Sequence, residues 1–508
     1  MASTTEELLK QALDQNLELT KQIQSLTEQV AYLTRKIYGS HSEKMADPNQ
    51  LSLLEENGVF TYPELTGQQS EEQEVTSTRK PKRKRVETID PRLPVEETII
   101  DRESELCEDG HHLTKMGKHL VREQVQYIPG RLYNEKIYEQ TYKCVECEKH
   151  DGLSHVYQGR APQALMPHSI ATASLVAEIL HAKYVLGTPL YRQAKEWARA
   201  GLLLSESTMT NWVIKTAELM KPIYDLLHGQ LLTQTFLQGD ETPFQVLREP
   251  GKRAQSKSYI WVERSIRRAD HQVIYYAYGD TRSGKFAQHI YSGFTGVLQC
   301  DGYAGYNLLG DSVVRVGCWA HVRRKFYDDA AKIKDKFTST RPLELLNKMF
   351  RLEEQWKSLN ANERLKLRQT ELRPVIKEFW SWCDSANPAP KSRLGVALTY
   401  AVNQRRQLNR ILEYGEIDLS NNASERNMKT FVIGRKNWLF ATSPKGADAN
   451  AIWMTIVETA KANGLDPRRY IEILLEAIPQ LPVFAGPEQL EAYLPWNINK
   501  LASKIMTA

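Results

Sequence analysis

Apolar positions in the first forty residues repeat with a period of seven. The first position of the repeat is held by Leu9, Asn16, Ile23, Val30 and Ile37, and the position three residues further on by Ala12, Leu19, Leu26 and Leu33. β-Branched residues at most first positions and leucine at most fourth positions favour a parallel two-stranded coiled coil. We therefore predict that residues 1–44 form a homodimer. A helix packed on its own domain is the weaker alternative, because the register persists over four heptads.

Residues 45–100 lack such periodicity and are predicted to be a flexible linker. Residues 45–77 contain seven acidic residues and no Lys or Arg, whereas the stretch RKPKRKR at 79–85 has six cations in seven positions. This switch is typical of a tether whose basic end contacts a polyanion. The cations that we expect to contact DNA are Lys82, Arg83, Lys84 and Arg85. A solvated linker without any contact explains the composition equally well.

Residues 101–160 contain half of the cysteines and are predicted to form a small β domain similar to a zinc ribbon. Cys144 and Cys147 have the Cys-x-x-Cys spacing that places two thiolates at adjacent corners of a tetrahedral zinc site. The first half provides only Cys107, with Gly110 where a second cysteine would complete a four-cysteine site. The histidines that could fill the fourth position are His111, His112, His150 and His155. A β domain without metal is the alternative to Zn²⁺ bound by Cys107, Cys144, Cys147 and His111.

The apolar pattern of residues 161–228 is helical. Residues 188–220 predict one helix, a turn at Gly201, and a second helix capped by Ser205 or Ser207. This arrangement is typical of a helix-turn-helix with polar residues exposed on the second helix. Helical hairpins of the same pattern also occur in proteins that do not bind DNA.

Residues 229–330 change to strand patterns. Five strands are predicted, with a helix at 283–291 between the third and the fourth: 233–242, 258–264, 271–279, 296–303 and 313–320. Three consecutive strands followed by strand–helix–strand is the order of an RNase H-like α/β domain. Residues 331–415 are helical throughout. The fold class that we predict is therefore multidomain α+β.

Three acidic residues fall on the elements that would meet at one end of this sheet. Asp240 ends the first strand, Asp301 ends the fourth, and Glu425 lies on a helix that follows the all-helical segment. Three carboxylates can bind two Mg²⁺ ions, or Mn²⁺ in their place, and leave coordination positions open for the substrate. Such a site catalyses phosphoryl transfer. Glu241 is excluded because neighbouring strand residues point to opposite faces.

Each of these acids also has a structural explanation. Asp301-Gly302 fits a turn, and Asp240 fits a solvated strand end. Asn422 and Glu425 fit a capping box, in which the N-cap side chain and the glutamate three residues later bond reciprocally to backbone N–H groups.

Basic residues surround Glu425 and also follow the fifth strand. The cations expected to hold DNA phosphates are Arg426, Lys429, Arg435 and Lys436. In the stretch CWAHVRRKF the candidates are His321, Arg323 and Arg324, and packing is the alternative role for His321. Trp438 fits either stacking on an unpaired base or a place in the core.

Composition limits the class of protein. The chain has 508 residues, 41% of them hydrophobic and 25% charged, which suits several soluble domains. Its six cysteines are too few for a disulfide scaffold and suggest a reducing compartment. We see neither a run of about 18 apolar residues nor a secretory signal, and we expect a cytoplasmic protein without membrane contact.

With these residues identified, the chain resembles transposases of the insertion-sequence-66 family, a bacterial group of DDE recombinases. The resemblance covers most of the chain, and its long, specific blocks in the catalytic core are LQCDGYAGYN (298–307), CWAHVRRKF (318–326) and NNASERNMKTFVIGRKNWLF (421–440). It implies Asp240, Asp301 and Glu425 as the catalytic triad. It also implies residues 331–415 as an insertion, 416–463 as the closing part of the catalytic core, and 464–508 as a C-terminal module. Gly110 departs from the family's usual ribbon.

The resemblance implies a transposase that binds the inverted-repeat ends of its element in double-stranded DNA. The enzyme would cleave the DNA there and join the freed 3′-hydroxyls to target DNA, with accessory proteins of the same element as further partners. A structure-specific nuclease on the same fold would cleave without joining. A DNA-binding regulator with an inactive catalytic domain would bind the ends and cleave nothing.

Overall fold

The computed structural model describes residues 130, 132–139, 141–144, 155–158, 163–330, 337–389, 391–482 and 485–498. The described residues from Glu139 onward belong to one compact unit, and residues 130 and 132–138 belong to a second. The predicted coiled coil and linker lie outside the described residues, and so do Lys82, Arg83, Lys84, Arg85, Cys107, His111 and Cys147. No helix in the described ranges is long and apolar enough to cross a membrane.

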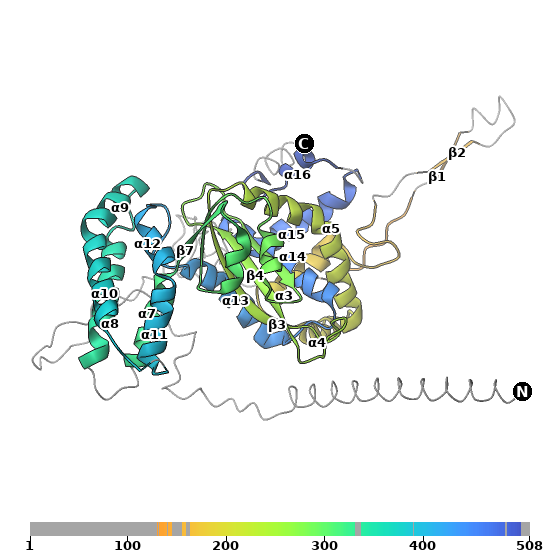
Figure 1. The fold of residues 1–508 in the computed structure, drawn as a ribbon. Coiled ribbons are helices and arrows are strands. Elements are labelled where there is room, and N and C mark those ends of the chain that lie inside the picture. Colours follow the sequence, from red (N-terminus) through yellow and green to blue (C-terminus); the bar gives the residue numbers. More distant parts are fainter. Residues whose placement is uncertain are drawn as a thin grey trace, which may run out of the picture. The chain divides into compact units, whose positions relative to one another are not determined.

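A mixed five-stranded sheet forms the centre of the larger unit (Figure 1). Its strands are β3 (Phe236–Gln245), β4 (Lys257–Ser265), β5 (Ile274–Gly279), β6 (Gly296–Cys300) and β7 (Val313–Gly317). Their order across the sheet is β5-β4-β3-β6-β7. β3 pairs antiparallel with β4 and parallel with β6, and β6 pairs parallel with β7. Helix α6 (Gly284–Ile290) lies between β5 and β6 in the chain, as the sequence predicted.

The position of Asp240 in its strand corrects the sequence prediction. Asp240 was expected at the end of the first strand, but β3 continues to Gln245 because its pairing with β4 extends that far. Pairing of β3 with β6 stops at Gln238, opposite Gln299. Asp240 therefore lies where β3 continues beyond its parallel partner, and Asp301 lies directly after the end of β6.

The outer edge of β5 is covered by helix α14 (Pro444–Ala462). Thr455 accepts the backbone N–H of Tyr276 at 2.9 Å, and Thr459 accepts that of Ile274 at 3.0 Å. The two threonines are four residues apart and so share one face of the helix. They satisfy donors that an exposed edge strand would leave free for another chain.

Three helices precede the sheet in the chain. They are α3 (Ala173–Tyr184), α4 (Leu190–Arg199) and α5 (Glu206–Leu232). Gly201 has φ +92° in the turn between α4 and α5, a conformation that favours glycine. Ser205 accepts the N–H of Thr208 at 3.0 Å, which confirms Ser205 as the cap of the second helix.

Helix α5 is longer than the predicted second helix and is built into the central core. The Tyr224 hydroxyl donates to the carbonyl of Tyr276 on β5 at 2.8 Å, and the Trp453 indole on α14 donates to the carbonyl of Val213 at 3.1 Å. Most of the buried face of α5 therefore contacts the sheet and α14. Polar residues are exposed along the solvent side of α5, among them Ser207 near its start and Asn211 and Lys215 further along.

A second, helical lobe follows β7 (Figure 1). Its helices are α7 (Trp319–Ala330), α8 (Phe337–Gln355), α9 (Ala361–Leu367), α10 (Arg373–Ser385), α11 (Arg393–Asn403) and α12 (Arg405–Asn409). Its core centres on Trp319, which is fully buried against Phe379 and Trp380. The buried Glu353 accepts hydrogen bonds from Arg364 at 2.7 Å and Arg368 at 2.5 Å. These partners satisfy charges that would otherwise be costly to bury.

The remaining elements lie near the ends of the described ranges. β1 (Thr141–Cys144) pairs antiparallel with β2 (His155–Gln158), so Cys144 is the last residue of a strand in a two-stranded sheet. Helix α13 (Asn422–Trp438) follows the helical lobe and precedes α14. Helices α15 (Pro467–Ala477) and α16 (Pro487–Glu491) complete the described chain.

Candidate active site

Asp240 is held in a buried, negatively charged environment. Its Oδ1 accepts the backbone N–H of Glu241 at 2.9 Å. Burial raises the pKa of Asp240 well above its usual value, and the charges of Glu241, Glu425 and Asp301 raise this pKa further. A nearby cation would therefore stabilise the ionised form of this carboxyl group.

Asp301 lies at the turn after β6. Its Oδ1 accepts the backbone N–H of Tyr303 at 2.9 Å, which confirms the turn predicted from Asp-Gly. Its other oxygen lies 4.0 Å from the guanidinium of Arg282. The turn thus orients the carboxylate while leaving it close to the other acids.

Glu425 is not part of a capping box, which corrects the sequence prediction. Helix α13 begins at Asn422, its N-cap is Asn421, and no side chain caps it. The reciprocal bond of a capping box needs a glutamate three residues after the N-cap, and Glu425 is four residues after it. The backbone N–H of Glu425 bonds to the carbonyl of Asn421 at 3.1 Å. Its carboxylate Oε1 instead lies 3.6 Å from His321 Nδ1.

The protonation state of Glu425 follows from its burial. Burial raises the pKa of Glu425 to about 8, while Arg324 opposes this shift and Asp301 adds to it. Burial also lowers the pKa of His321. Burial therefore disfavours the charged forms of both groups in this contact.

The three predicted carboxylates lie near enough to affect one another electrostatically. The charges of both Glu425 and Asp301 act on Asp240, and the charge of Asp301 acts on Glu425. The three come from the middle of β3, the turn after β6 and the first turns of α13. The fold thus unites acids that are far apart in the chain.

Glu241 supports this site, although the sequence analysis excluded it. It does point away from Asp240 along the strand, but its carboxylate accepts Arg282 Nε at 2.8 Å and the Tyr306 hydroxyl at 2.6 Å. Arg282 also approaches Asp301 at 4.0 Å. Glu241 therefore holds the cation that lies beside Asp301, and it acts as a positioning residue. Its position next to Asp240 was the only signal in the sequence.

Two buried glutamines link the three acid-bearing segments, and the sequence analysis missed them. Gln238 Nε2 donates to Gln299 Oε1 at 2.7 Å, and Gln299 Nε2 donates to the carbonyl of Asp418 at 2.6 Å. Gln238 also approaches the carbonyl of Ser420 at 3.5 Å. A glutamine two residues before each aspartate was the available signal, since residues two apart share a face.

The helical lobe reaches the site through Tyr400 on α11. The Tyr400 hydroxyl accepts the backbone N–H of Gly302, next to Asp301, at 3.2 Å. A Cβ atom added at Gly302 would lie 2.7 Å from the Tyr400 ring. Glycine at 302 therefore allows the close approach of the two segments.

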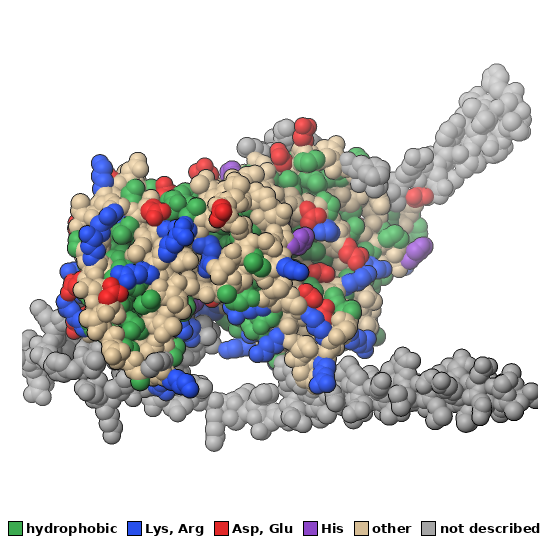
Figure 2. All heavy atoms as spheres, viewed as in Figure 1, with side chains coloured by type: hydrophobic (Ala, Val, Ile, Leu, Met, Phe, Trp, Pro, Cys, Tyr) green, Lys and Arg blue, Asp and Glu red, His purple; other side chains and the backbone are tan. Residues whose placement is uncertain are grey.

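The predicted DNA-binding cations of α13 occupy different surroundings. Arg426 and Lys436 are exposed, and Lys429 is half-buried. Arg435 is half-buried and donates a short hydrogen bond to the carbonyl of Pro243, so it ties α13 to β3. On the face shown in Figure 2, Lys and Arg side chains are interspersed with acidic ones and form no single continuous patch.

Two other candidates are largely packed inside the protein. The Arg323 guanidinium is buried, donates to Asn347 at 2.8 Å and lies over the ring of Phe350. Trp438 is half-buried, with the Lys183 ammonium 4.1 Å from the centroid of its ring. Both arrangements suit packing better than contact with a base or phosphate. Arg324 is half-buried and acts on the pKa of Glu425.

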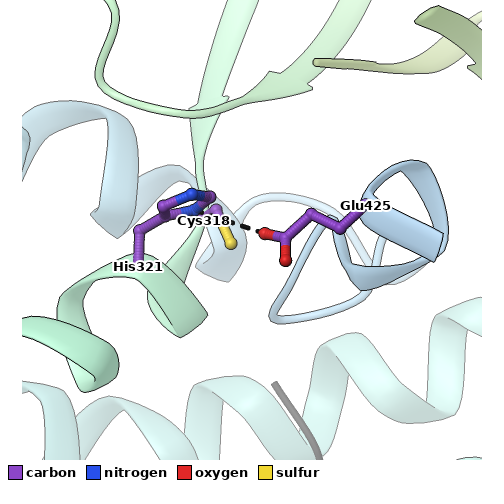
Figure 3. Close-up of side chains that lie close together, drawn as sticks. All are labelled: Cys318, His321 and Glu425. Carbon is purple, nitrogen blue, oxygen red and sulfur yellow. Dashed lines mark ion pairs between the residues drawn. The ribbon is translucent and has the colours of Figure 1, made fainter. Parts of the chain in front are cut away.

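Cys318 joins His321 and Glu425 in a compact cluster (Figure 3). It lies between β7 and α7, where the sequence pattern predicted that the strand would continue. The backbone N–H of Asn421 points at its sulfur at 3.4 Å. The sulfur, one imidazole nitrogen and one carboxylate oxygen all lie within 4.8 Å of one another.

The residues present fit a divalent cation. Asp240, Asp301 and Glu425 supply the hard oxygen ligands that Mg²⁺ and Mn²⁺ prefer. Glu425 Oε1 is buried and forms no hydrogen bond with the part of the chain that the structure describes. Burial, the largest cause, raises the pKa of both Asp240 and Glu425, and a bound cation would favour their ionised forms.

Curated relatives match at least two thirds of the chain. A protein of Sinorhizobium fredii described as uncharacterized protein y4jD is 29% identical over 96% of this chain and 98% of its own length. Uncharacterized protein y4hP of the same organism is 27% identical over 96% of this chain and 91% of its own length. Uncharacterized protein y4qI is 30% identical over 68% of this chain and 66% of its own length. No solved structure matches the chain.

Three family descriptions match successive parts of the chain. The description "Transposase C of IS166 homeodomain" matches residues 25–98, and "IS66 C-terminal element" matches residues 455–496. The description "Transposase IS66 family" matches residues 168–449, which include the sheet, the helical lobe and all three clustered carboxylates. The chain therefore belongs to the IS66 family of transposases.

Proposed function

We propose that this protein is a DDE transposase that cleaves DNA at the ends of its element and joins the 3′-hydroxyls to target DNA. The observation that carries the proposal is the convergence of Asp240, Asp301 and Glu425 from three separate elements. The family membership supports transposition as the process that this site serves.

We assign the sheet to the RNase H-like class. Three antiparallel strands in chain order, followed by two parallel strands beside the first, support this assignment. On this assignment the helical lobe is an insertion between the second aspartate and the glutamate. The carboxylates then occupy the sheet end at which such a fold carries its chemistry.

Asp240, Asp301 and Glu425 would hold two Mg²⁺ ions, with Mn²⁺ as a substitute. When bound, the metal ions would activate the attacking hydroxyl and stabilise the leaving oxygen. The residues of the chain supply the positions of these ligands: the turn bond from Tyr303 orients Asp301, and the Gln238–Gln299 pair fixes the approach to α13. The side chains of Glu425 and Asp301 are only 14% and 22% exposed, so their interaction with a cation is stronger than in bulk water.

The DNA contacts follow from the charge beside Glu425. Arg426 is exposed, Lys429 lies three residues further along α13, and Arg324 approaches Glu425 from α7. We assign these cations and Lys436 to backbone phosphates near the scissile bond, and Arg323 and Arg435 to packing. The basic residues 82–85, the Cys-containing segment and the exposed end of α5 would contribute to recognition of the ends. The N-terminal repeat would pair two protomers.

The test is a product analysis with labelled DNA that carries the element's own ends, Mg²⁺ or Mn²⁺, and the wild-type chain with any accessory proteins of the element. We expect both cleaved ends and end–target joints. Cleavage without joints would contradict the transposase and indicate a nuclease. A DNA-binding regulator would give a third result. Wild type and Asp301→Ala would both bind the ends normally, and neither would yield metal-dependent products.

A further inference from the structure

Cys318, His321 and Glu425 form a group of three metal-ligand side chains of mixed chemistry (Figure 3). Cys318 directly precedes α7, His321 lies in the first turn of α7, and Glu425 lies near the start of α13. We propose that these three residues form a binding site for a borderline transition-metal ion, Zn²⁺ being the natural occupant. The site is distinct in chemistry from the all-carboxylate centre but shares Glu425 with it.

The donor set selects the class of metal. A thiolate, an imidazole and a carboxylate are the usual protein ligands of zinc, whereas Mg²⁺ takes oxygen ligands and rejects sulfur. The 3.6 Å between His321 Nδ1 and Glu425 Oε1 is close to the separation of two ligands on one tetrahedral ion with bonds of about 2.0–2.1 Å. Three protein ligands leave a fourth position open for water, as in exchangeable rather than purely structural sites.

The surroundings of the sulfur support the assignment. Cys318 is 2% exposed, and the backbone N–H of Asn421 is directed at its Sγ at 3.4 Å. An N–H donor to sulfur stabilises a metal-bound thiolate and orients it, as outer ligands commonly do. Asn421 directly precedes α13, so the same backbone segment supports the sulfur and carries Glu425.

A second observation concerns Glu425 itself. Its Oε1 is buried, and no described residue gives it a hydrogen bond. Only 14% of the Glu425 side chain is exposed, so water alone has limited access to satisfy it. This buried oxygen faces a thiol and an imidazole. A metal ion bound by all three groups would satisfy it in place of a hydrogen-bond donor.

The sharing of Glu425 has a regulatory consequence, which rests on the proposed function. Glu425 contributes a carboxylate oxygen to this cluster, and the same side chain is assigned to the centre of Asp240 and Asp301. Zn²⁺ held by Cys318 and His321 would draw Glu425 away from Asp240 and Asp301. Zinc would therefore inhibit cleavage supported by Mg²⁺ or Mn²⁺, and it would require Cys318 to do so.

The direct test is Co²⁺ binding followed by absorption spectroscopy, since cobalt bound to a thiolate has a charge-transfer band that magnesium-type sites lack. The parent is the full chain with Cys107, Cys144 and Cys147 changed to serine, which removes the other candidate thiolate site. A phosphine reductant replaces thiols in the buffer. We expect a charge-transfer band that saturates at one cobalt per chain and that Zn²⁺ abolishes.

Variants decide whether the band belongs to this cluster. Cys318→Ser should remove the band, and Glu425→Gln should weaken cobalt binding about 10-fold or more. Cys383→Ser is the matched control, because Cys383 is also buried but lies in the helical lobe, and it should keep the band. Circular dichroism establishes that each variant is folded. A missing band in the folded parent, or an unchanged band after Cys318→Ser, would overturn the proposal.

A further pair of measurements separates this inference from the proposed function. Asp240→Asn should lose cleavage and retain the cobalt band, because Asp240 is outside the cluster. If the wild type shows the band but no cleavage, the metal site stands and the proposed function fails. If the protein is active, the cleavage rate of each variant is divided by its own rate without zinc. By this measure, inhibition by Zn²⁺ should be at least about 10-fold weaker in Cys318→Ser than in wild type.

Discussion

Gln238 on β3 donates a hydrogen bond of 2.7 Å to Gln299 on β6, and the two residues are direct partners in the parallel register. Each lies two residues before an aspartate of the candidate site, so this register also sets the relative positions of Asp240 and Asp301. Gln299 continues to the carbonyl of Asp418, in the segment that leads into α13. One chain of amide groups therefore connects the supports of all three carboxylates.

Removal of this connection should affect stability and activity together. Gln299→Leu keeps the side chain's approximate size but leaves the Gln238 amide and the Asp418 carbonyl buried without their partner. Buried polar groups left in this way cost about 1–3 kcal/mol each. We expect a lower free energy of unfolding in urea and a lower cleavage rate. Gln489→Leu, at an exposed position of α16, should change neither quantity appreciably, and an equal effect of both variants would contradict the role of the Gln238–Gln299 connection.

Contact of the helical lobe with the site should be sensitive to a single methyl group. Gly302→Ala would place Cβ 2.7 Å from the Tyr400 ring, so either the ring or the Asp301 turn must move. Overpacking of this kind typically costs about 1–3 kcal/mol. Thermal unfolding and cleavage rate are the measurements. Gly229→Ala on α5, where a Cβ meets nothing within 4 Å, is the matched control and should not destabilise the chain.

The raised pKa of Glu425 predicts a pH dependence of stability in the presence of a chelator. Its pKa rises from 4.5 to about 8 on folding, so the folded state binds more protons between these values. Stability should therefore fall as the pH rises through this range, by on the order of a few kcal/mol in total. Urea unfolding at several pH values should show a shallower fall for Glu425→Gln. Equal slopes for Glu425→Gln and wild type would contradict the assignment, and Glu413→Gln, at an exposed position, is the control.

The cations of α13 should determine the salt dependence of DNA binding. If Arg426 and Lys436 contact phosphates, each alanine variant should lower affinity and reduce the slope of log K against log salt by about 1. Fluorescence anisotropy across a series of salt concentrations measures both. Lys221→Ala, on α5 and paired with Asp225, is the control. An unchanged slope for Arg426→Ala would remove that residue from the proposed interface.

Much of the sheet could be predicted because its signals are local. Alternation and short connections gave the five strands, the helix between β5 and β6, and the all-helical lobe, and Ser205 was one of two caps proposed for α5. The family could also be recognised from long sequence blocks. Strand ends were less predictable, since pairing with β4 extends β3 past Asp240 and no local signal encodes that pairing.

The supporting residues were harder to predict because their roles depend on distant partners. Glu241 bonds to Arg282, which lies beyond β4 and β5 in the chain, and to Tyr306, which lies beyond β6 as well. The capping box at Asn422 failed because α13 begins one residue before the position that the motif requires. Cys318 was assigned to a strand, and only the approach of α13 to α7 places it beside Glu425.

The most direct test of the central claim compares wild type with Glu425→Gln in the Mg²⁺- or Mn²⁺-dependent cleavage and strand-transfer assay. The substitution keeps the shape of the side chain and removes the charge that a metal ion needs, and no cap is lost because Glu425 caps nothing. We expect cleaved and joined products from wild type and from Glu413→Gln, and none from Glu425→Gln. Equal products from wild type and Glu425→Gln would contradict the three-carboxylate site.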